Sequence, residues 1–254
     1  MSVLRPAEKM LVALGIERPA QIDLEAIAWA GGAVIKYRPL DRCEAMIVGA
    51  QHRAIITVNS RSIPTRRRFS IAHEIGHWHH HRGRILFCGA GDIGNPSYSA
   101  LNPETQADQF ASDLLLPDFM FRPIAGKMKR VVLSSVREIA DEFKVSATAT
   151  LLKLVESDRF PLLVVCHNKS GKRWFRRAPM VPGWWFPKDE LDAESIAFEM
   201  LFGGAAEISY VRNIGADAWF EFRGADRYEI QEQSFLLPNE EVLTLLILPA
   251  EGLG

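Results

Sequence analysis

The sequence of 254 residues has few cysteines, almost no net charge and no long apolar run. Its three cysteines, Cys43, Cys88 and Cys166, are odd in number and far apart. That pattern argues against a disulfide framework or a cysteine-rich zinc site and favours reduced thiols in a cytoplasm. The net charge of −1 gives no global sign of nucleic-acid binding. No apolar run reaches membrane-spanning length, and the first residues lack a signal-peptide layout. We therefore expect a cytoplasmic protein that makes no membrane contact.

What the sequence does contain is the run Ile71–Trp78, which holds the pattern H-E-x-x-H. On a helix, residues four apart share a face, so His73 and His77 can aim their imidazoles at one metal ion. Glu74 follows the first histidine, where a carboxylate can act as general base toward a water on the metal. The competing interpretation is an ordinary helix with two histidines on one face. A third ligand would decide between the two.

The positions seven and ten residues after His73 hold His80 and Gly83, which excludes the extended metzincin pattern. A later run, Asn102–Pro117, offers a carboxylate instead. Pro103 suits a helix start, which predicts that Glu104 lies in a first helical turn as the third ligand. Asp108 would lie one turn further along and fix the tautomer of a ligand histidine through a hydrogen bond. The alternative role for Glu104 is a carboxylate favoured by the helix dipole.

Two stretches together resemble the ImmA/IrrE metallopeptidases: R-F-S-I-A-H-E-I-G-H (Arg68–His77) and E-x-x-A-D-x-F-A-x-x-L-L-L-P (Glu104–Pro117). The resemblance is specific over about residues 20–120. Members usually carry Asn at the position of Asp108, so this chain keeps a hydrogen-bonding group there and adds a charge. The resemblance implies narrow proteolysis of a helix-turn-helix repressor, which switches on stress-response or mobile-element genes. A ligand set of two histidines and one glutamate suits Zn²⁺, although Mn²⁺ or Fe²⁺ could occupy it.

Residues 1–122 are expected to form a zincin-like core of helices and a small sheet. The last of its predicted strands leads directly into the metal helix and is our candidate for the edge strand that pairs with substrate, namely Ala54, Ile55, Ile56, Thr57 and Val58. The irregular segment 82–101 should border the cleft. Its Tyr98 could stabilise a tetrahedral oxyanion, although a packed or exposed loop tyrosine is the simpler interpretation.

The remaining chain predicts two further parts. Residues 123–159 read as a helix-turn-helix-like segment. Four basic and five acidic residues lie between Ser134 and Arg159, so direct DNA binding is possible but not favoured. Residues 160–254 are expected to form a small α+β domain that includes a helix over about Lys188–Phe202 and a strand at Ala218–Phe222. The resemblance offers a GAF-like sensor for this domain. In it, a basic cluster surrounds Gly171, for which a solvated hairpin is the simplest interpretation and contact with DNA or an acidic partner is the alternative. The aromatic run Trp184–Phe186 follows, for which a core or interface anchor is the simplest interpretation and the lining of a ligand pocket is the alternative.

The sequence as a whole predicts an α+β protein: a zincin-like metallopeptidase core, a helix-turn-helix-like segment and a small C-terminal α+β domain. The expected function is that of a cytoplasmic zinc endopeptidase with a protein substrate. The alternative is a DNA-binding or sensory transcriptional regulator that keeps a metal site for structure or signalling.

Overall fold

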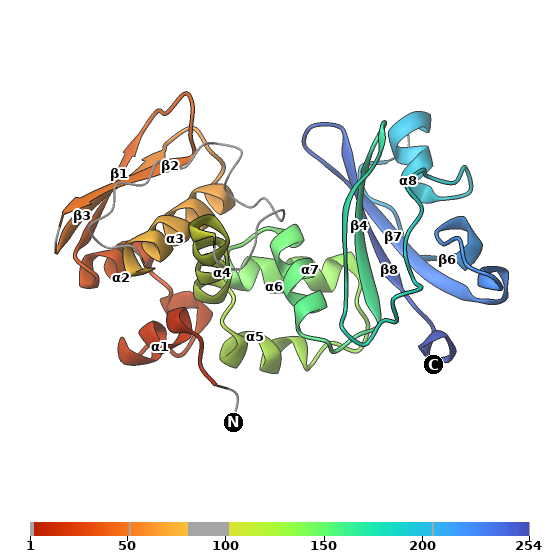
Figure 1. Cartoon of the computed structure of the whole chain (residues 1–254), viewed down its shortest axis with the longest axis horizontal. Coiled ribbons are helices and arrows are strands. Elements are labelled where there is room, and N and C mark those ends of the chain that lie inside the picture. Colours follow the sequence, from red (N-terminus) through yellow and green to blue (C-terminus); the bar gives the residue numbers. More distant parts are fainter. Residues whose placement is uncertain (1–2, 51, 81–101, 205, 254) are drawn as a thin grey trace. The chain divides into compact units, whose positions relative to one another are not determined.

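The computed structural model describes residues 3–50, 52–80, 102–204 and 206–253. It combines helices with two separate sheets, which confirms the predicted α+β class (Figure 1). The chain divides into two compact units. The first comprises the chain up to Ile124 together with Ile139–Ser146, and the second comprises Ala125–Glu138 together with Ala147 to the C-terminus. Both units therefore share the helix-turn-helix-like segment. No helix among the described residues has the length and apolar character needed to span a membrane.

The first unit is built from helices and strands whose bounds follow local sequence signals. In chain order they are α1 (Pro6–Ala13), α2 (Leu24–Ala30), β1 (Ala33–Arg38), β2 (Ala45–Ala50), β3 (Arg53–Asn59), α3 (Pro64–His80), α4 (Pro103–Leu115) and α5 (Asp118–Ala125). Asp23 caps α2, because its carboxylate accepts hydrogen bonds from the backbone amides of Glu25 and Ala26. Asn102 does the same for α4 by accepting from the amide of Glu104.

The three-stranded sheet has the order β1-β3-β2, with β1 parallel and β2 antiparallel to β3. The prediction that Ala54–Val58 is an edge strand is therefore wrong, because β3 is paired on both sides. The strand that precedes the metal helix in sequence can lie at the centre or at an edge of its sheet, so its place in the sequence does not decide which. Alternate residues of β3, Ala54, Ile56 and Val58, are buried. In Figure 1 helix α3 lies along one side of this sheet.

The packing of α3 against α4 positions the candidate site. Residues 70–78 of α3 are all buried, and α4 buries an apolar face that includes Ala107, Phe110 and Leu114. Gly76 makes the close approach possible: a Cβ atom there would lie 3.1 Å from the Cα and carbonyl oxygen of Ala107 and from the Cβ of Phe110. Any larger side chain would push the two helices apart.

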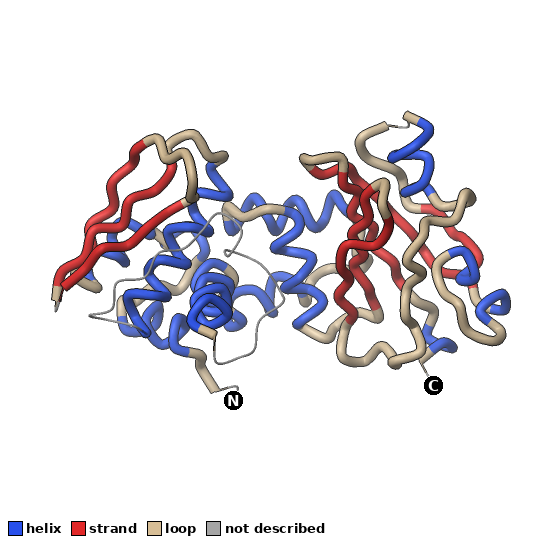
Figure 2. The backbone as a smooth tube through the Cα atoms, turned by 45° about the horizontal axis from the view of Figure 1, so that its top comes forward, coloured by secondary structure: helices blue, strands red, loops and turns tan. Residues whose placement is uncertain are grey.

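The second unit is a five-stranded antiparallel sheet of order β5-β4-β8-β7-β6. Figure 2 shows the strands of each unit gathered into a sheet of its own. The elements are α6 (Leu133–Phe143, which begins in this unit and ends in the first), α7 (Ala147–Glu156), β4 (Leu162–Asn168), β5 (Gly171–Arg177), α8 (Ile196–Phe198), β6 (Arg212–Gly215), β7 (Glu229–Leu237) and β8 (Glu241–Ile247).

Two predictions for the second unit are wrong. A strand was expected at Ala218–Phe222, but the chain there continues from a short 3-10 helix, Ala216–Ala218. Trp219 and Phe220 are buried in the core of this unit, so their apolar character reflects packing and not strand formation. A helix was expected over about Lys188–Phe202, but only α8 and a π-helical turn, Glu199–Gly203, form there.

Candidate metal centre

Two histidines of α3 face a glutamate in the first turn of α4. The Nε2 atoms of His73 and His77 lie 2.9 Å apart. One carboxylate oxygen of Glu104 lies 3.2 Å from Nε2 of His73, and the other lies 3.4 Å from Nε2 of His77. Both imidazoles are buried. The cap on α4 fixes where this helix begins, so local sequence signals determine which face of each helix carries the ligands.

These distances fit a shared divalent metal ion. Two ligand atoms bound about 2.0–2.1 Å from a tetrahedral zinc lie roughly 3.3 Å from each other, close to the separations of His73, His77 and Glu104. All three ligand atoms lie within 4.8 Å of one another, and no other such cluster of histidine, cysteine or acidic residues occurs in the part of the chain that the structure describes.

Asp108 supports the same arrangement through a hydrogen bond with His73. Its Oδ1 lies 2.9 Å from Nδ1 of His73, so Nδ1–H donates to the carboxylate and Nε2 keeps its lone pair toward the cluster. Burial would lower the pKa of His73, but hydrogen bonds to Asp108 and Glu104 outweigh it and raise the pKa to about 9. The surroundings of Nε2 therefore favour an added positive charge, which a divalent cation can supply as well as a proton.

Glu74 is the strongest sign that the cluster has a chemical task. Its side chain is fully buried, and neither carboxylate oxygen has a hydrogen-bond partner among the described residues. Burial raises the pKa of Glu74 to about 7, with Glu104 adding to the effect and His73 opposing it. A buried carboxylate without partners costs stability, which folded proteins usually avoid except at functional sites. Such a group fits a general base that meets its partner only when the site is occupied.

The other predicted residues lie elsewhere. Tyr98 falls outside the described residues, and Ala54–Val58 form the central strand.

Sequence reasoning missed Cys43, which comes shortly before β2. The pKa of its thiol is raised by burial, with a contribution from the negative charge of Glu74, so this end of β2 lies near the candidate base. The only signal for this in the sequence was the cysteine itself.

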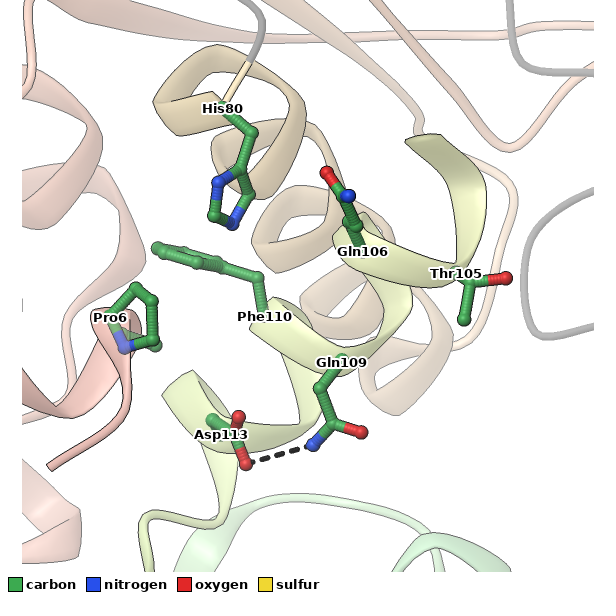
Figure 3. Close-up of a pocket in the computed structure, with 8 residues that line it drawn as sticks. Pro6, His80, Thr105, Gln106, Gln109, Phe110 and Asp113 are labelled. Carbon is green, nitrogen blue, oxygen red and sulfur yellow. Dashed lines mark hydrogen bonds between the residues drawn. The ribbon is translucent and has the colours of Figure 1, made fainter. Parts of the chain in front are cut away.

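A small cavity lies along α4 next to the cluster. It has a volume of about 260 Å³ and is lined by residues of α1, α3 and α4: Pro6, Ala7, His80, Thr105, Gln106, Gln109, Phe110 and Asp113 (Figure 3). Asp113 accepts hydrogen bonds from Gln109 and Arg5. The rings of His79 and His80 pack near Phe110, 5.1 and 5.6 Å between centroids. None of the cavity's residues belongs to the metal cluster.

A family model for the IrrE N-terminal-like domain of the M78 peptidases matches residues 32–155. This segment is an IrrE-like domain. The resemblance to the ImmA/IrrE family is thereby confirmed, and the family indicates a metallopeptidase. No curated protein sequence matches the chain. Among solved structures, the IrrE-like domain and the rest of the chain are similar in fold to a Mycobacterium tuberculosis transcriptional regulator. The TM-score is 0.61 at 16% sequence identity, over 97% of this chain and 87% of that one.

The helix-turn-helix-like segment at the end of the IrrE-like domain does not expose a recognition helix. Helix α7 packs against β4 and β5, and none of its residues is exposed. Thr150, Leu151 and Leu154 are fully buried. A helix that enters the major groove needs one free face, so α7 is poorly suited to reading DNA.

Proposed function

We propose that the protein is a cytoplasmic metalloendopeptidase that cleaves one protein partner, a helix-turn-helix transcriptional repressor. The observation that carries the proposal is the meeting of His73, His77 and Glu104 beside the buried, unpartnered carboxylate of Glu74. Three protein ligands leave room for water or substrate at the metal, as catalytic sites require and structural sites do not. The family of the IrrE-like domain supports the same reaction class.

In this proposal His73, His77 and Glu104 hold zinc, or manganese or iron in its place. The ion would supply Lewis acidity toward the peptide carbonyl and toward water. Glu74 accepts a proton from the attacking water and donates it to the amine that leaves when the C–N bond breaks. A pKa raised to about 7 suits both tasks, because the group can take up and release a proton near neutral pH. Asp108 holds the His73 ring in the required tautomer.

For substrate binding we propose strand addition to β2. This strand is an antiparallel edge of the sheet, and the chain just before it lies near Glu74. Neighbouring amides of a strand point to opposite sides, so either Ile47 or Val48 directs its N–H away from β3. Proline is introduced singly at each position. The variant that keeps its fold and bound metal should cleave more slowly; full cleavage by that variant would contradict strand addition.

The repressor as substrate, and stress-response or mobile-element genes as the outcome, are proposed from the family resemblance. The solved protein of similar fold is a transcriptional regulator, which is compatible with a role in gene control for this chain.

The deciding experiment compares newly formed protein N-termini in cells that express the wild type or Glu74→Gln. Metal content is measured in both proteins and should be equal, because Glu74 is not a ligand in this proposal. We expect one cut in a helix-turn-helix repressor with the wild type and none with the variant. The same new N-termini in both strains would refute Glu74 as the base.

The alternative function is a DNA-binding or sensory regulator with a structural metal site. The helix-turn-helix-like segment and the fold shared with a transcriptional regulator favour it; the buried α7 opposes it. A mobility shift with duplex DNA, measured at increasing salt, distinguishes the two functions.

A further inference from the structure

A pair of exposed aromatic side chains lies on the surface of the second unit, far in sequence from the metal centre. Trp184 and Phe186 are 55% and 54% exposed, whereas Trp185 between them is fully buried. The indole N–H of Trp185 donates to the carbonyl oxygen of Gly252 at 2.7 Å, and its ring meets Phe220 edge-on at 4.9 Å. The buried tryptophan anchors the segment, so its two neighbours are held outward in a fixed place.

The adjacent strand β5 adds a positive charge to this surface. The guanidinium of Arg177 donates to the carbonyl oxygen of Gly183 at 3.1 Å, directly beside Trp184. Arg177 is exposed and forms no ion pair within the described part of the chain. Its neighbour Arg176 is also exposed, but successive side chains of a strand point to opposite faces, so Arg176 belongs to the other face of β5.

Lys172, by contrast, is not available to a ligand. Its ammonium group pairs with Asp189 at 2.8 Å and lies 4.2 Å from the centre of the Phe186 ring. Phe175 meets the same ring edge-on at 5.0 Å. Lys172 and Phe175 therefore hold Phe186 in place, and Arg177 remains available to a ligand on this face.

Two simpler roles do not account for these features. Charged residues on an edge strand prevent sheets from joining, which explains the arginines of β5 but not two exposed aromatic rings beside them. Addition of a peptide strand would need the outer backbone edge of β5. That edge is partly occupied, because the amide of Lys172 donates to Asp189 O and the carbonyl of Phe175 accepts from Arg176. The exposed side chains here instead present aromatic ring faces and a guanidinium group.

We propose that this Arg–aromatic surface, formed by Phe175, Arg177, Trp184 and Phe186, binds single-stranded nucleic acid without sequence preference. Unstacked bases have flat faces that pack on exposed aromatic rings, and the phosphates between them pair with arginine. A duplex keeps its bases stacked inside and cannot use the rings. An acidic peptide has the charge but lacks the planar faces.

The test measures fluorescence anisotropy of a labelled oligothymidylate of about 12 nucleotides with the full-length protein. A duplex of the same length and a polyglutamate peptide are the comparison ligands. Trp184→Ala with Phe186→Ala should weaken binding by about tenfold or more. Trp184→Phe, which keeps a ring, should retain most of the affinity. Arg177→Ala should reduce the slope of log affinity against log salt by about 0.7, because each phosphate contact to a single strand contributes about 0.7.

The matched controls remove the same groups elsewhere. Arg223→Ala deletes an exposed arginine of the same unit, and Trp29→Ala deletes a tryptophan that is 73% exposed in the other unit. Unfolding curves verify that every variant is folded. The proposal is overturned if the oligothymidylate does not bind, if duplex or polyglutamate binds equally well or better, or if the controls lose as much affinity as the surface variants.

Discussion

Replacement of Gly76 by alanine tests whether the close contact of α3 and α4 sets the geometry of the metal centre. The added Cβ would lie 3.1 Å from three atoms of α4, while ordinary van der Waals contact begins at 3.4 Å. Two of those atoms belong to the backbone of Ala107 and the third is the Cβ of Phe110, so no side-chain rotation relieves the overlap. Helix α4 must move by about 0.3 Å or more.

That movement matters because Glu104 lies three residues before Ala107 on the same helix. Metal–ligand bonds tolerate deviations of about 0.2 Å, and rotation of the Glu104 side chain restores only part of the shift. We expect the affinity for zinc to fall about tenfold. Stability should change less: alanine in place of glycine favours a helix by about 1 kcal/mol, whereas overpacking costs about 1–3 kcal/mol. The net effect is a destabilisation of about 0–2 kcal/mol.

The assay combines zinc affinity, from competition with a chelator, with urea unfolding of the metal-free protein. Gly203→Ala is the control, because a Cβ there meets only the Cβ of Glu199 at an ordinary 3.9 Å. The reasoning is refuted if Gly76→Ala binds zinc as tightly as the wild type and unfolds about 1 kcal/mol less readily. That result would mean that helix propensity acts alone and that the two helices adjust without effect on the site.

Three further predictions concern other groups. Asp108→Ala should weaken zinc binding by about 10–100-fold in the chelator assay and Asp108→Asn by less, since the amide keeps an acceptor for Nδ1–H of His73; equal losses would point to the charge instead. Glu232→Ala should destabilise the second unit by about 3–5 kcal/mol in denaturant, because the buried carboxylate binds Arg212, Trp219 and the amide of Ile196; a loss below 1 kcal/mol would contradict this. Burial lowers the pKa of His167 in the folded protein to about 4. As the pH drops from about 6.5 to 4, the unfolded chain therefore binds a proton at His167 that the folded protein does not, and the free energy of unfolding falls. The loss is at most about 3 kcal/mol, and His167→Gln should remove it; an identical pH dependence in the variant would rule out His167 as its source.

The candidate metal site could be predicted from sequence because its geometry is local. The spacing of His73 and His77 within one helix fixes a common face, and the start of α4 fixes the face that carries Glu104 and Asp108. Only the meeting of the two helices is non-local, and small Gly76 between the two histidines hinted at it. The structure brings these side chains together at distances that fit a metal.

The order of the strands could not be predicted in the same way. The alternation of buried and more exposed residues along β3 shows that one face of the strand is buried. The same pattern is expected for a central strand and for an edge strand. Which strands pair depends on contacts between distant residues: Val34 and Val48 both lie beside Ile55 in the register, on opposite sides of it. No local signal specifies that β3 lies between its two partners.

In the second unit, helices and strands were harder to predict because some apolar residues pack in the core without belonging to a regular helix or strand. The run around Trp219 looks strand-like, yet the indole N–H of Trp219 donates to the buried carboxylate of Glu232 in β7. This contact links two segments that are separate in the sequence, and the backbone at Trp219 ends a short 3-10 helix and does not join a strand ladder. Glu232 itself gave no sign in the sequence of being buried. Polar residues that organise a core in this way are the ones that residue patterns miss, because a pattern assigns charged side chains to the surface. The basic cluster around Gly171 does lie on an exposed hairpin, as its simplest interpretation predicted, and what the residue pattern did not show is that exposed aromatic rings lie beside Arg177.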